Sequence, residues 1–284
     1  MPNLKELETA VMFWAGSHPE QTLAPLKRLG IRCGQLGIPG DLDLNCVSEW
    51  NRALRAAEFT VYTVFAAYTG EDYADVPTVE RTVGFLPLGT RDDRERRTYE
   101  VSDFAAGIGA PGIATHIGLV PADSSDADYL ALREMVRRVC DHAAKHHQTF
   151  ALETGQEDAV ALLDFVHDVQ RSNLGINFDP ANMIMYGTGD PIEAVGILGQ
   201  HVLSVHCKDG DWPPPADPIT LGRERPLGSG AVGVDRFLNQ LRQIGYKGPL
   251  SIEREGVDPT QWIRDIEAGI RLLEDLKRST PKRG

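Results

Sequence analysis

The sequence contains few cysteines and no long apolar run. Its four cysteines are scattered over 284 residues without a CxxC pair, which argues against a disulfide framework and against a zinc knuckle. No apolar stretch approaches the roughly 18 residues that a membrane-spanning helix needs. The first residues, MPNLKELETAV, do not resemble a secretory signal. These absences predict a cytoplasmic protein that keeps its thiols reduced and has no membrane partner.

Basic residues are also in short supply. Lysine and arginine together number 29 against 41 aspartates and glutamates, which gives a formal net charge of −12. Proteins that bind nucleic acid neutralise phosphates with basic side chains, so no nucleic-acid partner is expected. A small neutral substrate, or one held with the help of a cation, suits this charge better.

The second half of the chain alternates short apolar runs with amphipathic stretches. Each run has the length and β-branched content of a strand, and each stretch places apolar residues at helical spacing. The predicted strands are 149–153, 174–179, 202–206 and 249–253, and the predicted helices are 158–170, 191–198, 234–245 and 260–278. Four successive strand–helix units predict a parallel sheet.

The first half repeats this alternation less regularly. It contains predicted strands at 10–16, 33–40, 60–68 and 112–120, and a strongly helical stretch at 129–146. Eight strands that are each followed by a helix form a (β/α)8 barrel, an α/β fold of about 250 residues. A doubly wound open sheet is the main alternative, but no glycine-rich dinucleotide turn follows an early strand. We therefore predict a single TIM-barrel domain over residues 1–284.

Two segments interrupt the alternation. Residues 69–98, rich in Asp, Glu, Arg and Pro, follow the third predicted strand, and residues 210–233, rich in Pro and Gly, follow the seventh. Both are expected on the carboxyl-terminal face of the barrel, where active sites of this fold are built. Long ordered loops on that face often cover a site, although a tolerated surface insertion explains 69–98 equally well.

Acidic and imidazole side chains stand at the ends of five successive predicted strands. They are His116, Glu153, Asp179, His206 and Glu253, on strands four to eight. In a barrel these ends converge, and three converging carboxylates repel each other unless a cation lies between them. Oxygen ligands with one imidazole suit Mn²⁺ or Mg²⁺ and tolerate Co²⁺ or Zn²⁺. We therefore predict one divalent metal ion, with Mn²⁺ as the first choice.

Five stretches of the sequence resemble a known family. ALETGQED, GINFDPANMIMYGTGDP, VHCKD, PLG-x-G and GPLSIERE look like the sugar phosphate isomerase/epimerase family of xylose isomerase-like barrels. The resemblance implies that the metal ligands are Glu153, Asp179, His206 and Glu253, and that His116 contacts the substrate.

The sequence also departs from its relatives at two places. Thr154 and Gly155 follow Glu153, so this chain lacks the lysine of the E-x-K pattern associated with xylose isomerase. Asn182 stands where related nucleases and many keto-sugar epimerases carry a histidine. A multinuclear nuclease site is therefore not expected.

The chemistry that the resemblance implies is proton transfer next to a carbonyl group. A metal-bound ketose would be stabilised as its enediolate, while Glu153 and Glu253 serve as acid and base on opposite faces of one carbon. This pairing favours epimerisation, although an isomerase could manage with one carboxylate. A lyase or dehydratase acting on a keto-polyol or keto-glycoside could use the same site. A catalytically silent barrel that binds a sugar is the remaining alternative.

Other polar residues are candidates for substrate contact. A glutamate such as Glu157, in the first turn of a helix, is also favoured by the helix dipole alone. Lys208 should share the inward side with His206, where it could contact a hydroxyl or phosphate oxygen or form a salt bridge to Asp209 or Asp179. The candidates beyond His116 are Gln156, Glu157, Asn182, Lys208 and Arg225, the last of which also fits a solvated loop arginine.

A few remaining positions carry weaker expectations. Trp14 and Phe65 are expected to form apolar walls or ordinary core, and Asn177 is expected to point inward below the site. Four histidines on helical stretches are expected at the surface: His142, His146, His147 and His167. The oligomeric state stays open, although barrels of this kind often form homo-oligomers.

Overall fold

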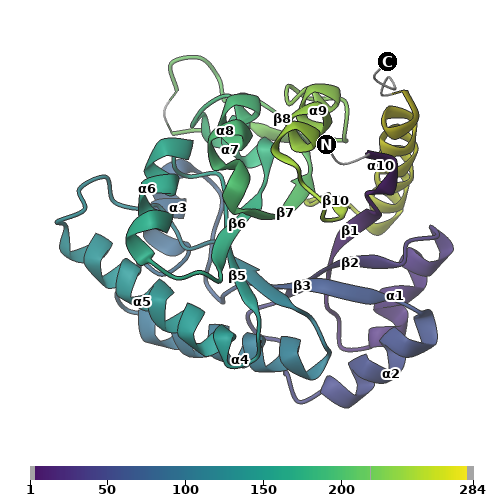
Figure 1. Cartoon of the computed structure of the whole chain (residues 1–284), viewed down its shortest axis with the longest axis horizontal. Coiled ribbons are helices and arrows are strands. Elements are labelled where there is room, and N and C mark those ends of the chain that lie inside the picture. Colours follow the sequence, from purple (N-terminus) through teal and green to yellow (C-terminus); the bar gives the residue numbers. More distant parts are fainter. Residues whose placement is uncertain (1–3, 218, 280–284) are drawn as a thin grey trace.

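Eight parallel strands close into a barrel that helices surround in the computed structural model (Figure 1). The structure describes residues 4–217 and 219–279. The barrel strands are β1 (Thr9–Trp14), β2 (Cys33–Ile38), β3 (Thr60–Ala66), β4 (Gly112–Thr115), β5 (Thr149–Glu153), β6 (Leu174–Phe178), β7 (Val202–Cys207) and β10 (Leu250–Ile252). Their order around the ring is β1-β10-β7-β6-β5-β4-β3-β2, and every neighbouring pair is parallel. The prediction of an α/β TIM barrel is confirmed.

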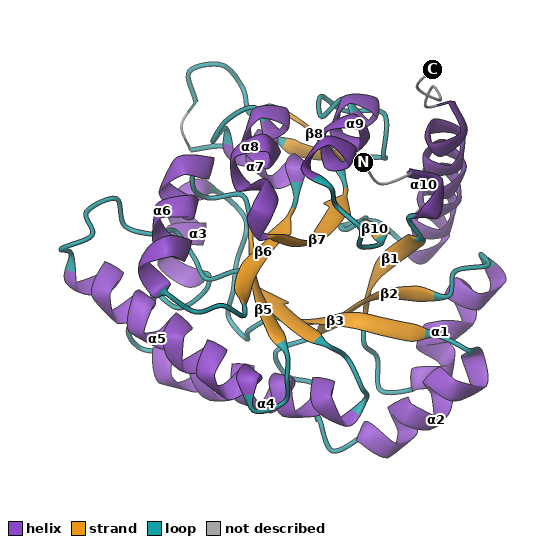
Figure 2. Cartoon of the chain, in the orientation of Figure 1, coloured by secondary structure: helices purple, strands orange, loops and turns teal. Residues whose placement is uncertain are grey.

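Helices form the outer layer of the barrel (Figure 2). They are α1 (Pro19–Arg28), α2 (Val47–Ala57), α3 (Val76–Thr82), α4 (Arg91–Gly107), α5 (Ala127–Ala144), α6 (Ala159–Val169), α7 (Pro180–Tyr186), α8 (Pro191–Leu198), α9 (Val234–Ile244) and α10 (Pro259–Ser279). The start of α8 shows how local sequence sets these bounds. Asp190 accepts a hydrogen bond from the Ile192 N–H at 2.7 Å, and Pro191 occupies the first helical position, where its missing N–H costs nothing.

Strand alternation divides the core into two layers. In β5, Phe150 and Leu152 face outward and belong to the large apolar cluster between strands and helices. Ala151 and Glu153 face into the barrel, since alternate side chains point to opposite faces of a strand. The apolar cluster inside the barrel consists of Met12, Phe65, Ala114 and Ala151. A small inner core therefore leaves room for polar side chains at the carboxyl ends of the strands.

The sequence analysis expected one uninterrupted loop at 69–98, and the structure differs. The segment contains α3, and from Arg91 onward it is the first part of α4, the barrel helix of the third unit. The helix lacks a clear apolar stripe because charged side chains are among its buried residues. Arg94, for example, donates to the Gly84 carbonyl and lies 5.5 Å from the centre of the Tyr68 ring.

The segment 210–233 folds back on itself. β8 (Asp209–Asp211) and β9 (Arg223–Arg225) pair as an antiparallel hairpin. The connection between them meets the start of α3, where the Val76 N–H donates to the Ile219 carbonyl at 3.0 Å. The two segments predicted on the carboxyl-terminal face therefore lie together.

Two smaller differences concern the ends of strands. β4 stops at Thr115, so His116 follows the strand and does not belong to it. β6 is followed by α7, a helix of 7 residues that the sequence analysis did not predict. Its brevity explains this, because so short a helix shows too few turns to establish a period.

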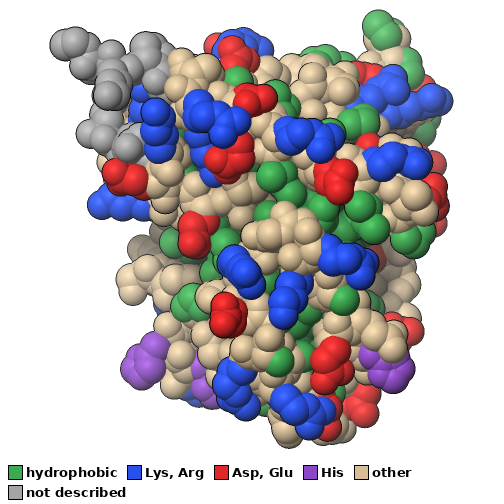
Figure 3. Space-filling model, turned by 90° about the vertical axis from the view of Figure 1, so that its right-hand side faces the viewer, with side chains coloured by type: hydrophobic (Ala, Val, Ile, Leu, Met, Phe, Trp, Pro, Cys, Tyr) green, Lys and Arg blue, Asp and Glu red, His purple; other side chains and the backbone are tan. Residues whose placement is uncertain are grey.

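Two observations concern the length of the helices and the charges of one face. None of the helices within residues 4–217 and 219–279 is both long and apolar enough to cross a bilayer. On the face shown in Figure 3, acidic and basic side chains are intermingled.

Candidate active site

Four side chains meet at the carboxyl-terminal ends of four neighbouring strands. Glu153 is the last residue of β5, Asp179 follows β6 and caps α7, His206 belongs to β7, and Glu253 follows β10. All four are buried, and one ligand atom from each lies within 4.8 Å of the others. The structure thus brings together the four residues at which the sequence predicts a metal site.

His206 lies at the centre of this cluster. Its Nδ1 atom is 2.9 Å from Glu153 Oε1, 3.0 Å from Glu253 Oε2 and 3.5 Å from Asp179 Oδ2. Asp179 Oδ1 accepts from two backbone N–H groups at the start of α7, whereas its Oδ2 is buried and accepts no hydrogen bond. A buried carboxylate oxygen without a donor is costly, and a cation would remove that cost. Three carboxylates and one imidazole therefore fit a divalent metal ion.

A chain of polar side chains inside the barrel orients the His206 ring. Nε2 lies 2.6 Å from Oε1 of Gln35 in β2, which places the ring proton on Nε2 and directs Nδ1 to the cluster. Gln35 Nε2 donates to Asn177 Oδ1 at 2.9 Å, and Ser204 Oγ donates to the same oxygen at 2.5 Å. Asn177 points inward, as predicted. The sequence analysis missed Gln35, whose one signal is a long polar side chain in the run CGQLGI.

The charges of the cluster shift the pKa values of its members. Burial alone would raise the pKa of Glu153, but the positive charges of His116 and His206 outweigh it and lower this pKa. Burial alone would lower the pKa of His206, but Glu253 and Glu153 raise it well above its ordinary value. With this raised pKa, the metal-free ring carries a second proton on Nδ1 beside the one on Nε2, and a metal ion that bound Nδ1 would displace that second proton.

His116 faces Glu153 from the loop after β4. Its Nε2 atom lies 2.7 Å from Glu153 Oε2, and its ring centre lies 6.0 Å from that of Phe65 and 5.8 Å from that of Tyr73. Burial would lower the pKa of His116, but the charge of Glu153 outweighs it and raises this pKa. One oxygen of Glu153 is thus held by His116, while the other lies beside His206.

Lys208 holds the opposite carboxylate. Its Nζ atom lies 2.9 Å from Glu253 Oε2, and 3.6 Å from both Asp179 Oδ2 and Glu255 Oε2. Burial would lower the pKa of this lysine, but Glu253 and Asp179 raise it well above its ordinary value. The sequence analysis considered a salt bridge of Lys208 to Asp209 or to Asp179, and the structure contains the one to Asp179. Asp209 instead accepts hydrogen bonds from backbone N–H groups.

The remaining predicted substrate contacts divide into two groups. Asn182 lines the cavity and donates from Nδ2 to Glu153 Oε1 at 3.3 Å. Gln156, Glu157 and Arg225 are not among the described residues that line the cavity. Glu157 Oε1 accepts from a backbone N–H in the loop after β4 at 2.8 Å, and Arg225 pairs with an aspartate of β8 at 2.6 Å.

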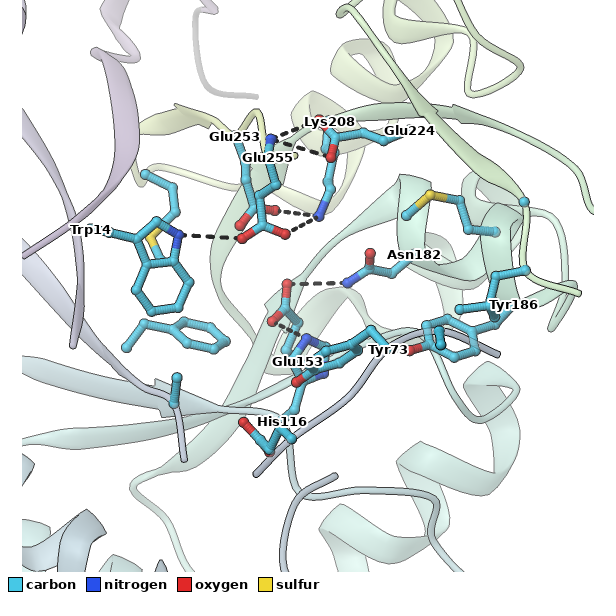
Figure 4. Close-up of a pocket in the computed structure, with 18 of the residues that line it drawn as sticks. Trp14, Tyr73, His116, Glu153, Asn182, Tyr186, Lys208, Glu224, Glu253 and Glu255 are labelled. Atoms are coloured by element: carbon cyan, nitrogen blue, oxygen red, sulfur yellow. Dashed lines mark hydrogen bonds and ion pairs between the residues drawn. The ribbon is translucent and has the colours of Figure 1, made fainter. Parts of the chain in front are cut away.

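The cavity above the cluster has a volume of about 410 Å³. Figure 4 shows Glu153 and His116 on one side of it and Glu253 with Lys208 on the other. The two glutamates thus approach the same space from two directions, and each has a cationic or protonatable neighbour. This arrangement can move protons to and from a bound molecule on two sides.

The walls of the cavity come from both halves of the chain. Trp14 and Phe65 contribute to them, as the sequence predicts. The lining residues that the sequence analysis missed include Tyr73, Tyr186, Glu224 and Glu255. Glu255 could have been found, because it lies two residues after Glu253 and alternation places both on one side. Tyr73 and Glu224 belong to the two irregular segments, where no periodicity indicates which side chains point inward.

Comparison with known proteins matches most of the chain to one family. A family model described as xylose isomerase-like TIM barrel matches residues 23–276. The crystal structure of a xylose isomerase domain protein from Planctomyces limnophilus is 42% identical, with a TM-score of 0.91 over 96% of this chain and 98% of that one. An uncharacterised protein of Methanocaldococcus jannaschii is 30% identical over 98 residues, which cover 34% of this chain and 31% of that protein.

More distant structures share the fold. A xylose isomerase-like TIM barrel protein from Mycobacterium smegmatis, in complex with magnesium, is 16% identical with a TM-score of 0.73 over 98% of this chain and 99% of that one. D-psicose 3-epimerase from Clostridium cellulolyticum, solved with D-tagatose, is 15% identical, with a TM-score of 0.69 over 95% of this chain and 99% of that one. From the family model and the closed barrel together, we conclude that this chain belongs to the xylose isomerase-like TIM barrel family.

Proposed function

We propose that this protein is a divalent-metal-dependent epimerase or isomerase of an uncharged ketose or a related keto-sugar. The observation that carries the proposal is the pair Glu153 and Glu253, which enter one cavity from two sides and belong to the four-residue cluster that fits a cation. Mn²⁺ is the proposed ion, since oxygen ligands with one imidazole suit it. Distant relatives of the same fold support the proposal, because their names include 3-epimerases of psicose and ribulose.

The proposed reaction moves two protons at one carbon. A bound metal ion would polarise the carbonyl oxygen and make the neighbouring C–H more acidic. One glutamate takes the proton from that carbon, which leaves an enediolate, and the other glutamate returns a proton to the opposite face. One carboxyl group ends protonated and the other ionised, and exchange with water restores both. His116 and Lys208 keep Glu153 and Glu253 aimed at the substrate.

The charges of the cavity favour an uncharged substrate. The only lysine or arginine among the described lining residues is Lys208, which already lies next to Glu253 and Glu255. Five carboxylates line the same space: Glu71, Glu153, Glu224, Glu253 and Glu255. A phosphate group would meet these carboxylates at close range in a partly desolvated space, where like charges repel strongly. A free sugar would instead find many acceptors for its hydroxyl groups.

A deuterium-exchange assay tests the proposal. The chain, loaded with Mn²⁺, is incubated in D₂O with a panel of free ketoses, 3-keto-glycosides and matched sugar phosphates, and products are analysed by NMR and mass spectrometry. We expect one free keto-sugar to gain one deuterium at an inverted or isomerised carbon, and its phosphate to react far more slowly. Glu153→Gln and Glu253→Gln should each lower kcat by at least about 10²-fold, the typical contribution of a general acid or base.

Glu157→Gln is the matched control for these variants. It makes the same substitution four residues after Glu153, at a buried glutamate outside the cavity lining, and should keep most of the activity. An unsaturated product that has lost water would show a lyase in place of an epimerase. A chain that binds no Mn²⁺ and turns over none of the panel would overturn the proposal and favour a silent binding barrel.

A further inference from the structure

A second group of potential metal ligands lies outside the barrel, where α4 and α5 pack against each other. Asp103 belongs to α4, His142 to the last turn of α5, and His146 to the turn that follows α5. Asp103 Oδ1 lies 2.7 Å from His142 Nε2 and 2.8 Å from His146 Nε2. Ligand atoms of all three residues lie within 4.8 Å of one another. Two imidazoles and a carboxylate thus converge on one point.

The surrounding contacts hold these side chains in position. The ring of His142 stacks on Tyr99 of α4, with centres 4.5 Å apart and an angle of 13° between the planes. The turn after α5 is tied to α4 by buried hydrogen bonds: Ser102 Oγ donates to Gln148 Oε1 at 2.6 Å, and Gln148 Nε2 donates to the Ser102 carbonyl at 3.2 Å. Ser102 and Gln148 are close in sequence to the ligands, so both sides of the cluster are fixed before any ion binds.

We propose that Asp103, His142 and His146 form a second metal site, which binds Zn²⁺. Residues four apart on a helical turn lie on one face, so both imidazoles can reach one ion. Two nitrogen ligands and one carboxylate suit Zn²⁺ better than Mn²⁺ or Mg²⁺, which prefer oxygen. The partly exposed position leaves a fourth ligand place for water. The barrel cluster has three carboxylates and therefore suits Mn²⁺ or Mg²⁺ better than Zn²⁺.

Binding replaces the hydrogen bonds that now join the three side chains. Each imidazole binds through Nε2 as the neutral tautomer that carries its proton on Nδ1, and the carboxylate of Asp103 binds as the anion. Partial burial of Asp103 opposes ionisation, but the hydrogen bonds from His142 and His146 outweigh it and lower its pKa. The bound ion ties α4 to the turn that leads into β5 and adds to the stability of that part of the barrel.

Zinc stoichiometry measured by equilibrium dialysis tests this site. The wild-type chain should bind one more Zn²⁺ than His142→Ala or His146→Ala at the same free zinc concentration, and Asp103→Asn should bind that ion at least about tenfold more weakly. Zn²⁺ should also raise the unfolding temperature of the wild type more than that of His146→Ala. Because the cluster is partly exposed, these variants are expected to fold, which circular dichroism checks.

His147→Asn is the matched control. His147 is exposed beside the cluster with φ of 58°, a conformation that asparagine tolerates, and its replacement removes a neighbouring imidazole without touching the three ligands. The control should bind as much zinc as the wild type. Equal zinc binding by the wild type, His142→Ala and His146→Ala would overturn the proposal, as would an equal loss in His147→Asn.

Discussion

Among single residues, Glu157 shows how burial governs a carboxyl group. It is 6% exposed and accepts the Val120 N–H at 2.8 Å, and burial raises its pKa to about 7 from 4.5. Because the folded chain holds this proton more tightly than the unfolded chain, the contribution of Glu157 to stability is present in full below about pH 4.5. It is lost as the pH rises towards 7.

Replacing Glu157 by glutamine should remove this pH dependence. Glutamine can still accept the Val120 N–H but has no charge to bury. We subtract the unfolding free energy of the wild type from that of Glu157→Gln at each pH. We expect this difference to be roughly 2 kcal/mol larger at pH 8 than at pH 5. Urea denaturation at the two pH values measures it. Glu193→Gln, at an exposed position of α8, should show no such gain, and a pH-independent difference for Glu157→Gln would refute the argument.

Single residues also mark the limit of what the sequence predicts about the site. His116, Glu153, Asp179, His206 and Glu253 could be picked out because each follows or ends an apolar run. Gln35 could not, because its importance depends on contact with His206 across 171 positions of sequence. Propensity and periodicity act locally, whereas this pairing is created only when the barrel closes.

At the scale of elements, Asp209 organises the loop that follows the β8–β9 hairpin. Its Oδ1 accepts from the N–H groups of Gly210 and Val232 at 2.9 and 3.1 Å, and its Oδ2 accepts from those of Gly228 and Gly230 at 2.9 Å each. The stretch PLGSGAV is thus wrapped around one buried carboxylate. The hairpin also carries Glu224 to the cavity. The carboxylate of Asp209 therefore supports a wall of the site.

Asp209→Asn should weaken this loop. An amide can accept through only one oxygen, so two of the four N–H groups lose their acceptor and face an NH₂ group instead. Buried unsatisfied donors cost about 1–3 kcal/mol each, and we expect a loss of roughly 3 kcal/mol in unfolding free energy together with faster proteolysis within 226–232. Asp211→Asn, in the exposed pair with Arg225, should cost less than about 1 kcal/mol. Equal losses in both variants would contradict the assignment.

The elements of the second half could be predicted from sequence more fully than those of the first. β5 and α8 have the predicted bounds, since apolar alternation and the Asp190-Pro191 start act locally. α4 could not be recognised, because its charged residues are buried by tertiary contacts such as that between Arg94 and Tyr68. The hairpin in 210–233 was equally hidden, since its strands have 3 residues each and a charged sequence.

At the scale of the whole molecule, the barrel brings together residues that are far apart in sequence. The strands that carry the cluster are β5, β6, β7 and β10, which are consecutive around the ring. Parallel pairing aligns their carboxyl ends, so acidic side chains gather at one place. A cation bound there would join four strands of the barrel and offset the repulsion between the carboxylates. Removal of the metal should therefore lower the stability of the whole chain against unfolding.

Removal and return of Mn²⁺ should therefore shift the thermal unfolding of the entire chain. At a free Mn²⁺ concentration 100 times its dissociation constant, binding to the folded state contributes about 2.7 kcal/mol. For a chain of this size that corresponds to a rise of roughly 5 °C over the EDTA-treated protein. His206→Ala removes the one imidazole of the barrel cluster and should abolish most of the rise. His146→Ala alters only the outer cluster and should keep it, because Mn²⁺ favours oxygen ligands. If Mn²⁺ stabilised His206→Ala as much as the wild type, the ion would be binding elsewhere and the barrel cluster would not be its site.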